Sequence, residues 1–265
     1  MRLEGWDCHV HVFDGKAPAR AGHYVPPRRT LAMLSLAAGP IGVRHFVVVQ
    51  PSVYGCDNRV LLDALREGRG LHRGVVVVDD SISGASLAAM HHLGVRGVRC
   101  NLVSPVGNSP AGLARIAPFL RDMGWHVEWY APAEHLADIA EFQEKHRLPC
   151  VIDHLAGLNS VAAADAAEVA LRRIADGGGW LKLSGWYRLE ATAPYAELDP
   201  LIRRAADVFG ERCVWGSDWP HTMFIERGAG ATSPDYVQTW QPVSRALGAE
   251  HADRVLCLQP ALLYA

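Results

Sequence analysis

Strand-like runs alternate with helix-like segments along almost the whole sequence, and this alternation limits the possible folds most strongly. Eight runs rich in apolar and β-branched residues begin 22 to 39 residues apart, the length of a strand plus a crossover helix. Unbroken apolar runs such as Phe46–Val49 and Val75–Val78 are typical of parallel strands covered on both faces. The eight predicted strands are Gly5–Val12, Arg44–Pro51, Arg73–Asp79, Val95–Leu102, His126–Ala131, Cys150–Leu155, Trp180–Trp186 and Cys213–Asp218.

The segments between these runs carry helix start and stop signals. Asp57 and Asn58 precede a predicted helix at Arg59–Glu67, Ser83 precedes one at Ala85–Leu93, and glycines end a third at Val161–Ala175. Eight strand–helix units in 265 residues predict an α/β fold, the (β/α)8 or TIM barrel, as one domain spanning residues 1–265. An open doubly wound sheet is the alternative. The regular units, and the lack of Gly-x-Gly-x-x-Gly after the first strand, disfavour it.

Charge and cysteine content exclude several classes of partner. The chain has 26 Lys and Arg against 28 Asp and Glu, for a net charge of −2, which argues against a nucleic-acid surface or a polybasic membrane patch. We find no apolar stretch long enough for a transmembrane helix and no signal-peptide pattern. The six cysteines are scattered and form no Cys-x-x-Cys. We therefore expect a reduced, cytoplasmic protein with no membrane partner.

Four titratable residues fall at predicted strand ends, where a barrel of this kind builds its active site. His9 and His11 alternate along the first strand and should share one side, with Cys8, Val10 and Val12 on the other. His154 ends the sixth strand and Asp218 the eighth. Each residue alone has an ordinary structural explanation, but three imidazoles and a carboxylate at one mouth indicate catalysis or metal binding.

Further polar residues lie near the same mouth. Arg99 shares a face with Asn101 in the fourth strand, and Arg188 lies on the loop after the seventh; guanidinium groups suit carboxylate ligands. In the fifth strand Tyr130 should lie at the mouth with Glu128 one layer deeper. Glu128 either orients a histidine or is a buried structural carboxylate.

These motifs together resemble the amidohydrolase superfamily, in particular the amidohydrolase 2 group with its 2-pyrone-4,6-dicarboxylate lactonases and related lactonases. The resemblance runs from Asp7-Cys8-His9-Val10-His11 to Trp215-Gly216-Ser217-Asp218-Trp219-Pro220-His221. Between them lie the segment 50–58, Arg96-Gly97-Val98-Arg99, Asp153-His154, and Leu183-Ser184-Gly185 followed by Tyr187-Arg188. One departure is Pro105, which stands where the dicarboxylate lactonases have a second arginine.

The resemblance implies a hydrolase that opens a small carboxylated lactone. It assigns Asp218 as the base that activates water, with His9, His11 and His154 beside it. Arg99 and Arg188 would hold substrate carboxylates, and Ser52, Tyr130 and Tyr24 would make polar contacts. His221 would either contact substrate or cap the following loop.

Several alternatives remain open from the sequence. The site works either with no metal or with one divalent ion, zinc being favoured, held by His9, His11, His154 and Asp218. A zinc-dependent decarboxylase, a sugar lactonase and a noncatalytic anion-binding barrel are the competing functions. The segment 222–234 forms either a lid or an ordinary loop, and the protein is expected to be a monomer or a homodimer.

Overall fold

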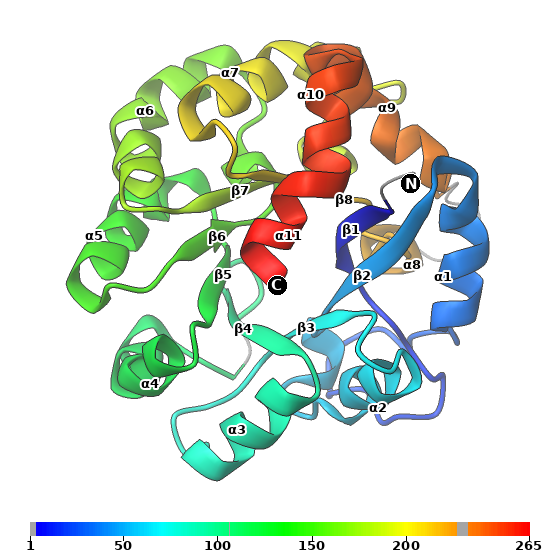
Figure 1. Cartoon of the computed structure of the whole chain (residues 1–265), viewed down its shortest axis with the longest axis vertical. Helices are drawn as coiled ribbons and strands as arrows, with labels where there is room; N and C mark the ends of the chain where they lie inside the picture. Colours follow the sequence, from blue (N-terminus) through cyan, green and yellow to red (C-terminus); the bar gives the residue numbers. More distant parts are fainter. Residues whose placement is uncertain (1–3, 106, 227–232) are drawn as a thin grey trace.

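The computed structural model describes residues 4–105, 107–226 and 233–265, and its eight parallel strands follow one another around a barrel in sequence order (Figure 1). The strands are β1 Gly5–Val10, β2 Val43–Val49, β3 Arg73–Val76, β4 Val95–Asn101, β5 His126–Tyr130, β6 Cys150–Ile152, β7 Trp180–Ser184 and β8 Cys213–Gly216. Two backbone hydrogen bonds join the first strand to the residues just after β8 and so close the barrel. His11 N donates to the Trp219 carbonyl at 2.8 Å, and Asp218 N donates to the His9 carbonyl at 2.9 Å. The predicted (β/α)8 barrel is therefore confirmed.

Helices surround the strands (Figure 1). They are α1 Leu31–Ala38, α2 Arg59–Glu67, α3 Gly84–His92, α4 Pro110–Asp122, α5 Leu136–His146, α6 Val161–Asp176, α7 Asp199–Phe209, α8 Thr222–Glu226, α9 Tyr236–Leu247, α10 Ala249–Asp253 and α11 Gln259–Tyr264, with a π-helical turn at Arg254–Leu258 before the last. Ser83 caps α3 as predicted, accepting from the Ser86 N–H. Asn58 does not cap α2, because its side chain bonds the backbone of Val77 instead.

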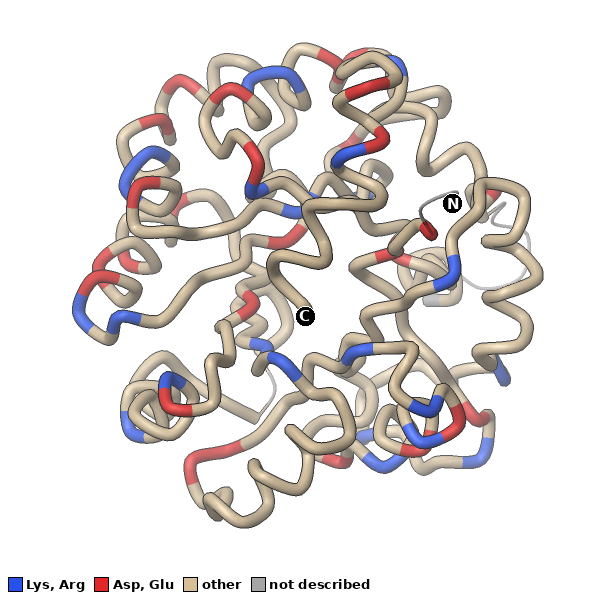
Figure 2. The backbone as a smooth tube through the Cα atoms, in the orientation of Figure 1, with Lys and Arg blue, Asp and Glu red and all other residues tan. Residues whose placement is uncertain are grey.

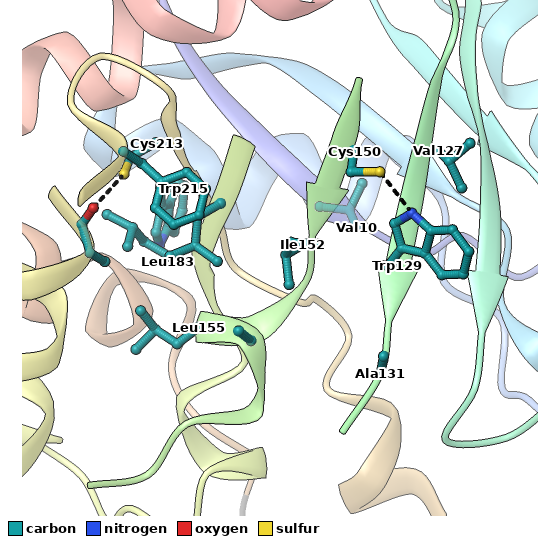
Figure 3. Packing of buried hydrophobic residues seen from close by; sticks show 14 of the residues in the cluster. Val10, Val127, Trp129, Ala131, Cys150, Ile152, Leu155, Leu183, Cys213 and Trp215 are labelled. Atoms are coloured by element: carbon teal, nitrogen blue, oxygen red, sulfur yellow. Dashed lines mark hydrogen bonds between the residues drawn. The ribbon is translucent and has the colours of Figure 1, made fainter. Parts of the chain in front are cut away.

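Two layers of apolar side chains fill the molecule. The outer layer lies between strands and helices and includes Ile152, Leu183 and Trp215 (Figure 3). Charged residues of both signs recur around the helices in the view of Figure 2. The inner layer fills the barrel itself, with Trp6, Cys8, Val47, Val49, Val75, Val151, Trp180, Val214 and Tyr264. Burying a large apolar side chain contributes about 1.5–3 kcal/mol, so the two layers supply most of the driving force for folding.

The chain's last helix closes the end of the barrel where the strands begin. In Figure 1 α11 crosses the middle of the ring of strands. Its Tyr264 stacks on Trp6 at 6.2 Å between ring centroids and meets the edge of His126 at 5.6 Å. The opposite end, where the strands finish, is left for a functional site, as the architecture predicts.

The predicted strand starts agree with the structure to within one residue, but every predicted end runs one to three residues too far. β6 stops at Ile152 and β8 at Gly216, so His154 and Asp218 lie in irregular backbone beyond the strands. Both have positive φ, 51° and 58°, which a strand cannot accommodate. The predicted strands were too long because the apolar sequence pattern continues past the last strand residue. In the structure the chain turns at the barrel mouth, and the extended conformation ends there.

The segment 222–234 differs from the expectation of a non-helical stretch. Thr222–Glu226 forms the short helix α8, while residues 227–232 of the expected lid or loop lie outside the described residues. In the described ranges, no helix is both long enough and apolar enough to cross a bilayer.

Candidate active site

Two histidines turn toward the mouth from the end of the first strand because β1 contains a bulge. Between Asp7 and Val10 the strand uses one more residue than β2 does over the paired interval. A bulge of this kind re-aims the side chains that follow it. His9 and His11 consequently lie on the same side, as predicted. Cys8 packs in the inner layer rather than on the opposite side, because strict alternation fails at the bulge.

Both imidazoles present Nε2 to one carboxylate oxygen. His11 Nδ1 is 2.8 Å from the Val49 carbonyl, so it donates its proton there and leaves Nε2 with a lone pair. That Nε2 lies 3.4 Å from Oδ1 of Asp218, and His9 Nε2 lies 3.7 Å from the same oxygen. Burial lowers the pKa of His9 well below its usual value, although the neighbouring Asp153 opposes this. At neutral pH His9 is therefore an uncharged imidazole.

His154 reaches the same point from the turn after β6. Its Nδ1 is 2.8 Å from the hydroxyl of Ser184, and its Nε2 is 4.0 Å from Oδ2 of Asp218. Burial lowers the pKa of His154 to about 4, so this ring is also uncharged at neutral pH. Gly185 packs directly against the ring: a Cβ there would lie 2.4 Å from His154 Nδ1. Gly185 thus lets the imidazole approach the backbone after β7.

Replacing Gly185 with alanine is expected to displace His154 and to lower turnover as well as stability. The backbone there has φ 65°, which costs a non-glycine residue about 1–2 kcal/mol before any clash. Gly42→Ala is the matched control: Gly42 has φ 78° but open space around it, so it carries the backbone cost alone. Denaturant unfolding and steady-state rates of both variants separate the two effects. Equal losses in both variants would show that contact with His154 does not matter.

Asp218 is a fully buried carboxylate with its two oxygens in different roles. Oδ2 accepts from the Tyr187 hydroxyl at 2.5 Å and from Arg188 Nε at 2.6 Å, while Oδ1 has no hydrogen-bond partner among the described residues. Burial would raise the pKa of Asp218, but the charge of Arg188 holds it well below its usual value. Asp218 is accordingly ionised at neutral pH, with Oδ1 facing the two imidazoles.

A cluster of charged side chains lies beneath these residues inside the barrel. Lys182 from β7 contacts Glu128, and its Nζ lies 3.1 Å from His9 Nδ1 and 3.4 Å from Asp153 Oδ1. Arg99 Nη2 reaches Asp153 Oδ2 at 3.3 Å. Burial, and then the charge of Asp153, raise the pKa of Glu128 to about 7, with Lys182 opposing them. Glu128 is thus one member of an ion cluster under His9.

A pocket of about 210 Å³ opens above this cluster. Pockets for drug-sized ligands run to about 300–1,000 Å³, so this one suits a smaller molecule. Arg99 and Arg188 both lie over the Tyr130 ring, with their guanidinium carbons 5.5 and 5.6 Å from its centroid. None of the described lining residues is acidic, so the pocket is electropositive. They are His11, His23, Tyr24, Pro51, Ser52, Val53, Arg99, Asn101, Val103, Ser104, Tyr130, Arg188 and Thr222.

One arginine and one histidine differ from the simplest expectation. Arg188 is bonded to Asp218, and its Nη2 donates to the Thr222 hydroxyl at 2.8 Å, so it holds the carboxylate as well as lining the pocket. His221 does not line this pocket. Its Nδ1 is 2.8 Å from Ser233 Oγ, and it lines a separate groove with Trp219 and Pro220. His221 thus packs against Tyr187 outside this pocket, and its contact with Ser233 is of the loop-capping kind expected as the alternative to substrate contact.

Comparison with known proteins identifies the family to which the chain belongs. Residues 6–257 match the family model described as Amidohydrolase. This chain belongs to the amidohydrolase family. It is 35% identical over 234 residues to a 2-pyrone-4,6-dicarboxylate hydrolase of Comamonas testosteroni, covering 81% of this chain and 76% of that protein. It is 28% identical over 232 residues to a 4-sulfomuconolactone hydrolase of Hydrogenophaga intermedia, covering 83% and 76%.

Solved structures agree with this amidohydrolase in fold. A Pseudomonas putida protein, solved as a candidate 2-pyrone-4,6-dicarboxylic acid hydrolase, superposes with a TM-score of 0.86 at 28% identity, over 100% of this chain and 98% of that one. A Burkholderia multivorans amidohydrolase with bound zinc has a TM-score of 0.76 at 18% identity, over 98% and 99%. At 18% identity, the similarity to the Burkholderia protein is evidence for the barrel fold only.

Two overlapping groups of buried side chains in this amidohydrolase offer ligands for a divalent ion. His9, His11 and Asp218 offer ligand atoms within 4.8 Å of one another, as do His9, Asp153 and His154. Three of these buried atoms, Nε2 of His9, Nε2 of His154 and Oδ1 of Asp218, lack a hydrogen-bond partner in the described chain. Nitrogen and carboxylate ligands of this kind are what zinc prefers.

Sequence reasoning missed two residues of the site. Lys182 interrupts an apolar strand, Trp180–Ser184, at a position whose neighbours Leu181 and Leu183 belong to the outer layer. A charged residue on the inward side of a buried strand is the signal that identifies it. Tyr187 lies in the quoted motif beside Arg188, but only the 3₁₀ turn at Trp186–Arg188 brings its hydroxyl to Asp218.

Proposed function

We propose that this amidohydrolase opens a small lactone bearing at least one carboxylate, by attack of water at the barrel mouth. One observation carries the proposal: an ionised, buried Asp218 faces three imidazoles beside a pocket lined by two arginines and no acid. The named activities of the similar proteins, which act on 2-pyrone-4,6-dicarboxylate and 4-sulfomuconolactone, support the same substrate class.

Asp218 accepts the proton of the attacking water through Oδ1. This oxygen is the free one, since Tyr187 and Arg188 occupy Oδ2. A carboxylate held ionised in this way is a weak base, so the reaction relies on a reactive ester such as a lactone. Once the ring carbonyl has been attacked, Asp218 returns the proton to the leaving ring oxygen.

The histidines lie where negative charge develops on the carbonyl oxygen. His9 and His154 are uncharged at neutral pH and can donate hydrogen bonds without repelling the arginines. Preorganised donors of this kind stabilise an oxyanion by about 2.7–4 kcal/mol each. His11 Nε2 is the acceptor that can hold the attacking water against Asp218.

The arginines and the polar lining orient the substrate. Guanidinium groups bind carboxylates through two parallel bonds, and Arg99 and Arg188 line the pocket next to Tyr130. Asn101 donates to Ser52 at 2.8 Å, which fixes that hydroxyl at the pocket wall, and Tyr24 lines the same wall. Pro105 is absent from the lining, where the neighbouring Ser104 contributes instead.

We also propose that His9, His11, His154 and Asp218 hold a zinc ion when one is available. Bound zinc would polarise a carbonyl and lower the pKa of a bound water to about 7. The roles of Arg99, Arg188 and Tyr130 in binding and orienting the substrate are the same with or without it.

A panel of lactones tests the substrate class. We expect ring opening of carboxylated pyrones and muconolactones, followed by absorbance, with kcat/KM about 10²-fold above that for the methyl ester of the same lactone. The ester keeps the shape but loses the charge-assisted hydrogen bonds, worth about 1.5–3 kcal/mol each. Equal rates for acid and ester would contradict the proposed anchoring. Faster opening of sugar lactones would favour that alternative, and release of carbon dioxide without ring opening would favour a decarboxylase.

A further inference from the structure

Lys182 is a fully buried lysine to which the proposed reaction assigns no role. It lies in β7, with its ammonium group inside the barrel beneath the pocket, and does not line that pocket. Its Nζ contacts Glu128 Oε2 and lies 3.4 Å from Asp153 Oδ1. Its third neighbour is His9 Nδ1, at 3.1 Å. A buried ammonium needs such partners, but only the contact with His9 reaches toward the reacting atoms.

Lys182 and two carboxylates compete for His9 Nδ1, and they demand opposite protonation of the ring. Asp153 Oδ1 at 3.2 Å and Glu128 Oε1 at 3.6 Å can only accept, whereas Lys182 can only donate. The contact with Lys182 has hydrogen-bond geometry, while Asp153 Oδ1 has no hydrogen-bond partner in the described ranges. With Lys182 donating, Nδ1 of His9 is the acceptor, and the neutral ring carries its proton on Nε2.

The tautomer decides what His9 can do at the mouth. With the proton on Nε2, the ring donates toward the position of the carbonyl oxygen or Asp218 Oδ1, which lies 3.7 Å from Nε2. With the proton on Nδ1, the ring donates to Asp153 and presents a lone pair on Nε2, the form that binds a metal. Lys182 therefore favours the tautomer of His9 that donates a hydrogen bond, and Asp153 favours the tautomer that binds a metal.

We propose that Lys182 is a positioning residue that holds His9 in its Nε2-protonated tautomer, so that His9 serves as a hydrogen-bond donor in the metal-free site and must move its proton to Nδ1 before it binds zinc. The role in turnover rests on the proposed lactone hydrolysis, whereas the tautomer itself does not. Removing the ammonium leaves Asp153 as the neighbour of Nδ1, which reverses the tautomer and turns His9 into a good zinc ligand.

Nitrogen NMR of the imidazoles measures the tautomer directly. In long-range ¹H–¹⁵N spectra of ¹⁵N-histidine-labelled protein, with His9 assigned by the signal lost in His9→Asn, we expect a protonated Nε2 and an unprotonated Nδ1 in the wild type. We expect the reverse in Lys182→Met. A wild-type His9 protonated on Nδ1, or a tautomer unchanged in Lys182→Met, would overturn the proposal.

Zinc titration and kinetics add two measurements, zinc affinity and kcat. If Lys182 were needed only for stability, its replacement would not raise zinc affinity while lowering kcat. Calorimetry should show zinc bound about 10-fold more tightly by Lys182→Met, the usual size of an outer-partner effect. Metal-free turnover of the carboxylated lactone should fall in kcat with KM nearly unchanged. Weaker or unchanged zinc binding would contradict the tautomer switch.

Two further variants keep the test informative. Lys182→Met/Glu128→Gln removes the closest pair of opposite charges together, and it replaces the single variant if that protein does not fold. Lys145→Met, on the exposed face of α5, is the control for loss of a lysine and should match the wild type in every readout. If no lactone is opened by the wild type, the proposed function fails, while the NMR and zinc results still decide the role of Lys182.

Discussion

Replacing Asp218 with asparagine is expected to lower kcat for lactone opening by about 10³-fold, because the water loses its proton acceptor. Asparagine keeps the shape of the side chain and can still accept from Tyr187 or Arg188 through its amide oxygen. Binding of a non-hydrolysed carboxylated analogue should therefore change less than about threefold. The measurement is steady-state kinetics together with calorimetric titration of the analogue.

The control for this variant is Asp207→Asn. Asp207 lies on the exposed face of α7, so the same chemical change there should leave both turnover and binding at wild-type values. If Asp218→Asn retained more than a tenth of wild-type turnover, another group would have to accept the proton. His11 would then be the next candidate, because its Nε2 carries a lone pair 3.4 Å from the carboxylate.

The sequence predicted the barrel well because its signals are local and repeated. Each strand is a short apolar run, and helix-forming segments separate one run from the next. The failures occur where tertiary contacts override those signals. Cys8 faces inward because of a bulge, a register feature set by pairing with β2 that alternation within β1 cannot reveal. Asn58 fails to cap α2 because a backbone 19 residues away binds its amide.

The sequence was enough to predict the site residues at the strand ends. It was not enough to predict the side chains that contact them from inside the barrel. His9, His11, His154 and Asp218 all converge within hydrogen-bond or near-contact distance, as the barrel geometry predicts. The pairing of Arg188 with Asp218 depends on the 3₁₀ turn after β7, which no periodicity indicates. Lys182 was missed because a single lysine in an apolar strand gives no spacing pattern.

The buried histidines make stability depend steeply on pH. Burial lowers the pKa of His126 to about 3 and those of His72, His154 and His221 to about 4, and that of His9 falls well below its usual value. The unfolded chain binds these protons below about pH 6.5, whereas the folded chain does not. Stability contributed by these groups is therefore present above pH 6.5 and is lost as the pH falls toward 4.

Two buried carboxyls act in the opposite direction. Burial raises the pKa of Asp7 to about 6 and that of Glu128 to about 7, so between about pH 4.5 and 6 the folded chain holds two protons that the unfolded chain lacks. Five histidines less two carboxyls leave about three protons in favour of the unfolded chain near pH 5.5. At about 1.36 kcal/mol per proton and pH unit, the free energy of unfolding should fall by about 4 kcal/mol per pH unit there.

Urea unfolding at closely spaced pH values between 5 and 7 measures this slope. His126→Asn removes one of the five imidazoles with a lowered pKa. His126 lies at the base of the barrel, where its ring contacts Tyr264 and not the proposed active site. This variant should be less stable than the wild type at pH 7, but its slope near pH 5.5 should be smaller by about 1.4 kcal/mol per pH unit. A flat wild-type profile, or identical slopes for the two proteins, would mean that the histidines take up protons in the folded barrel. The packing of uncharged imidazoles described here would then be wrong for the protein in solution.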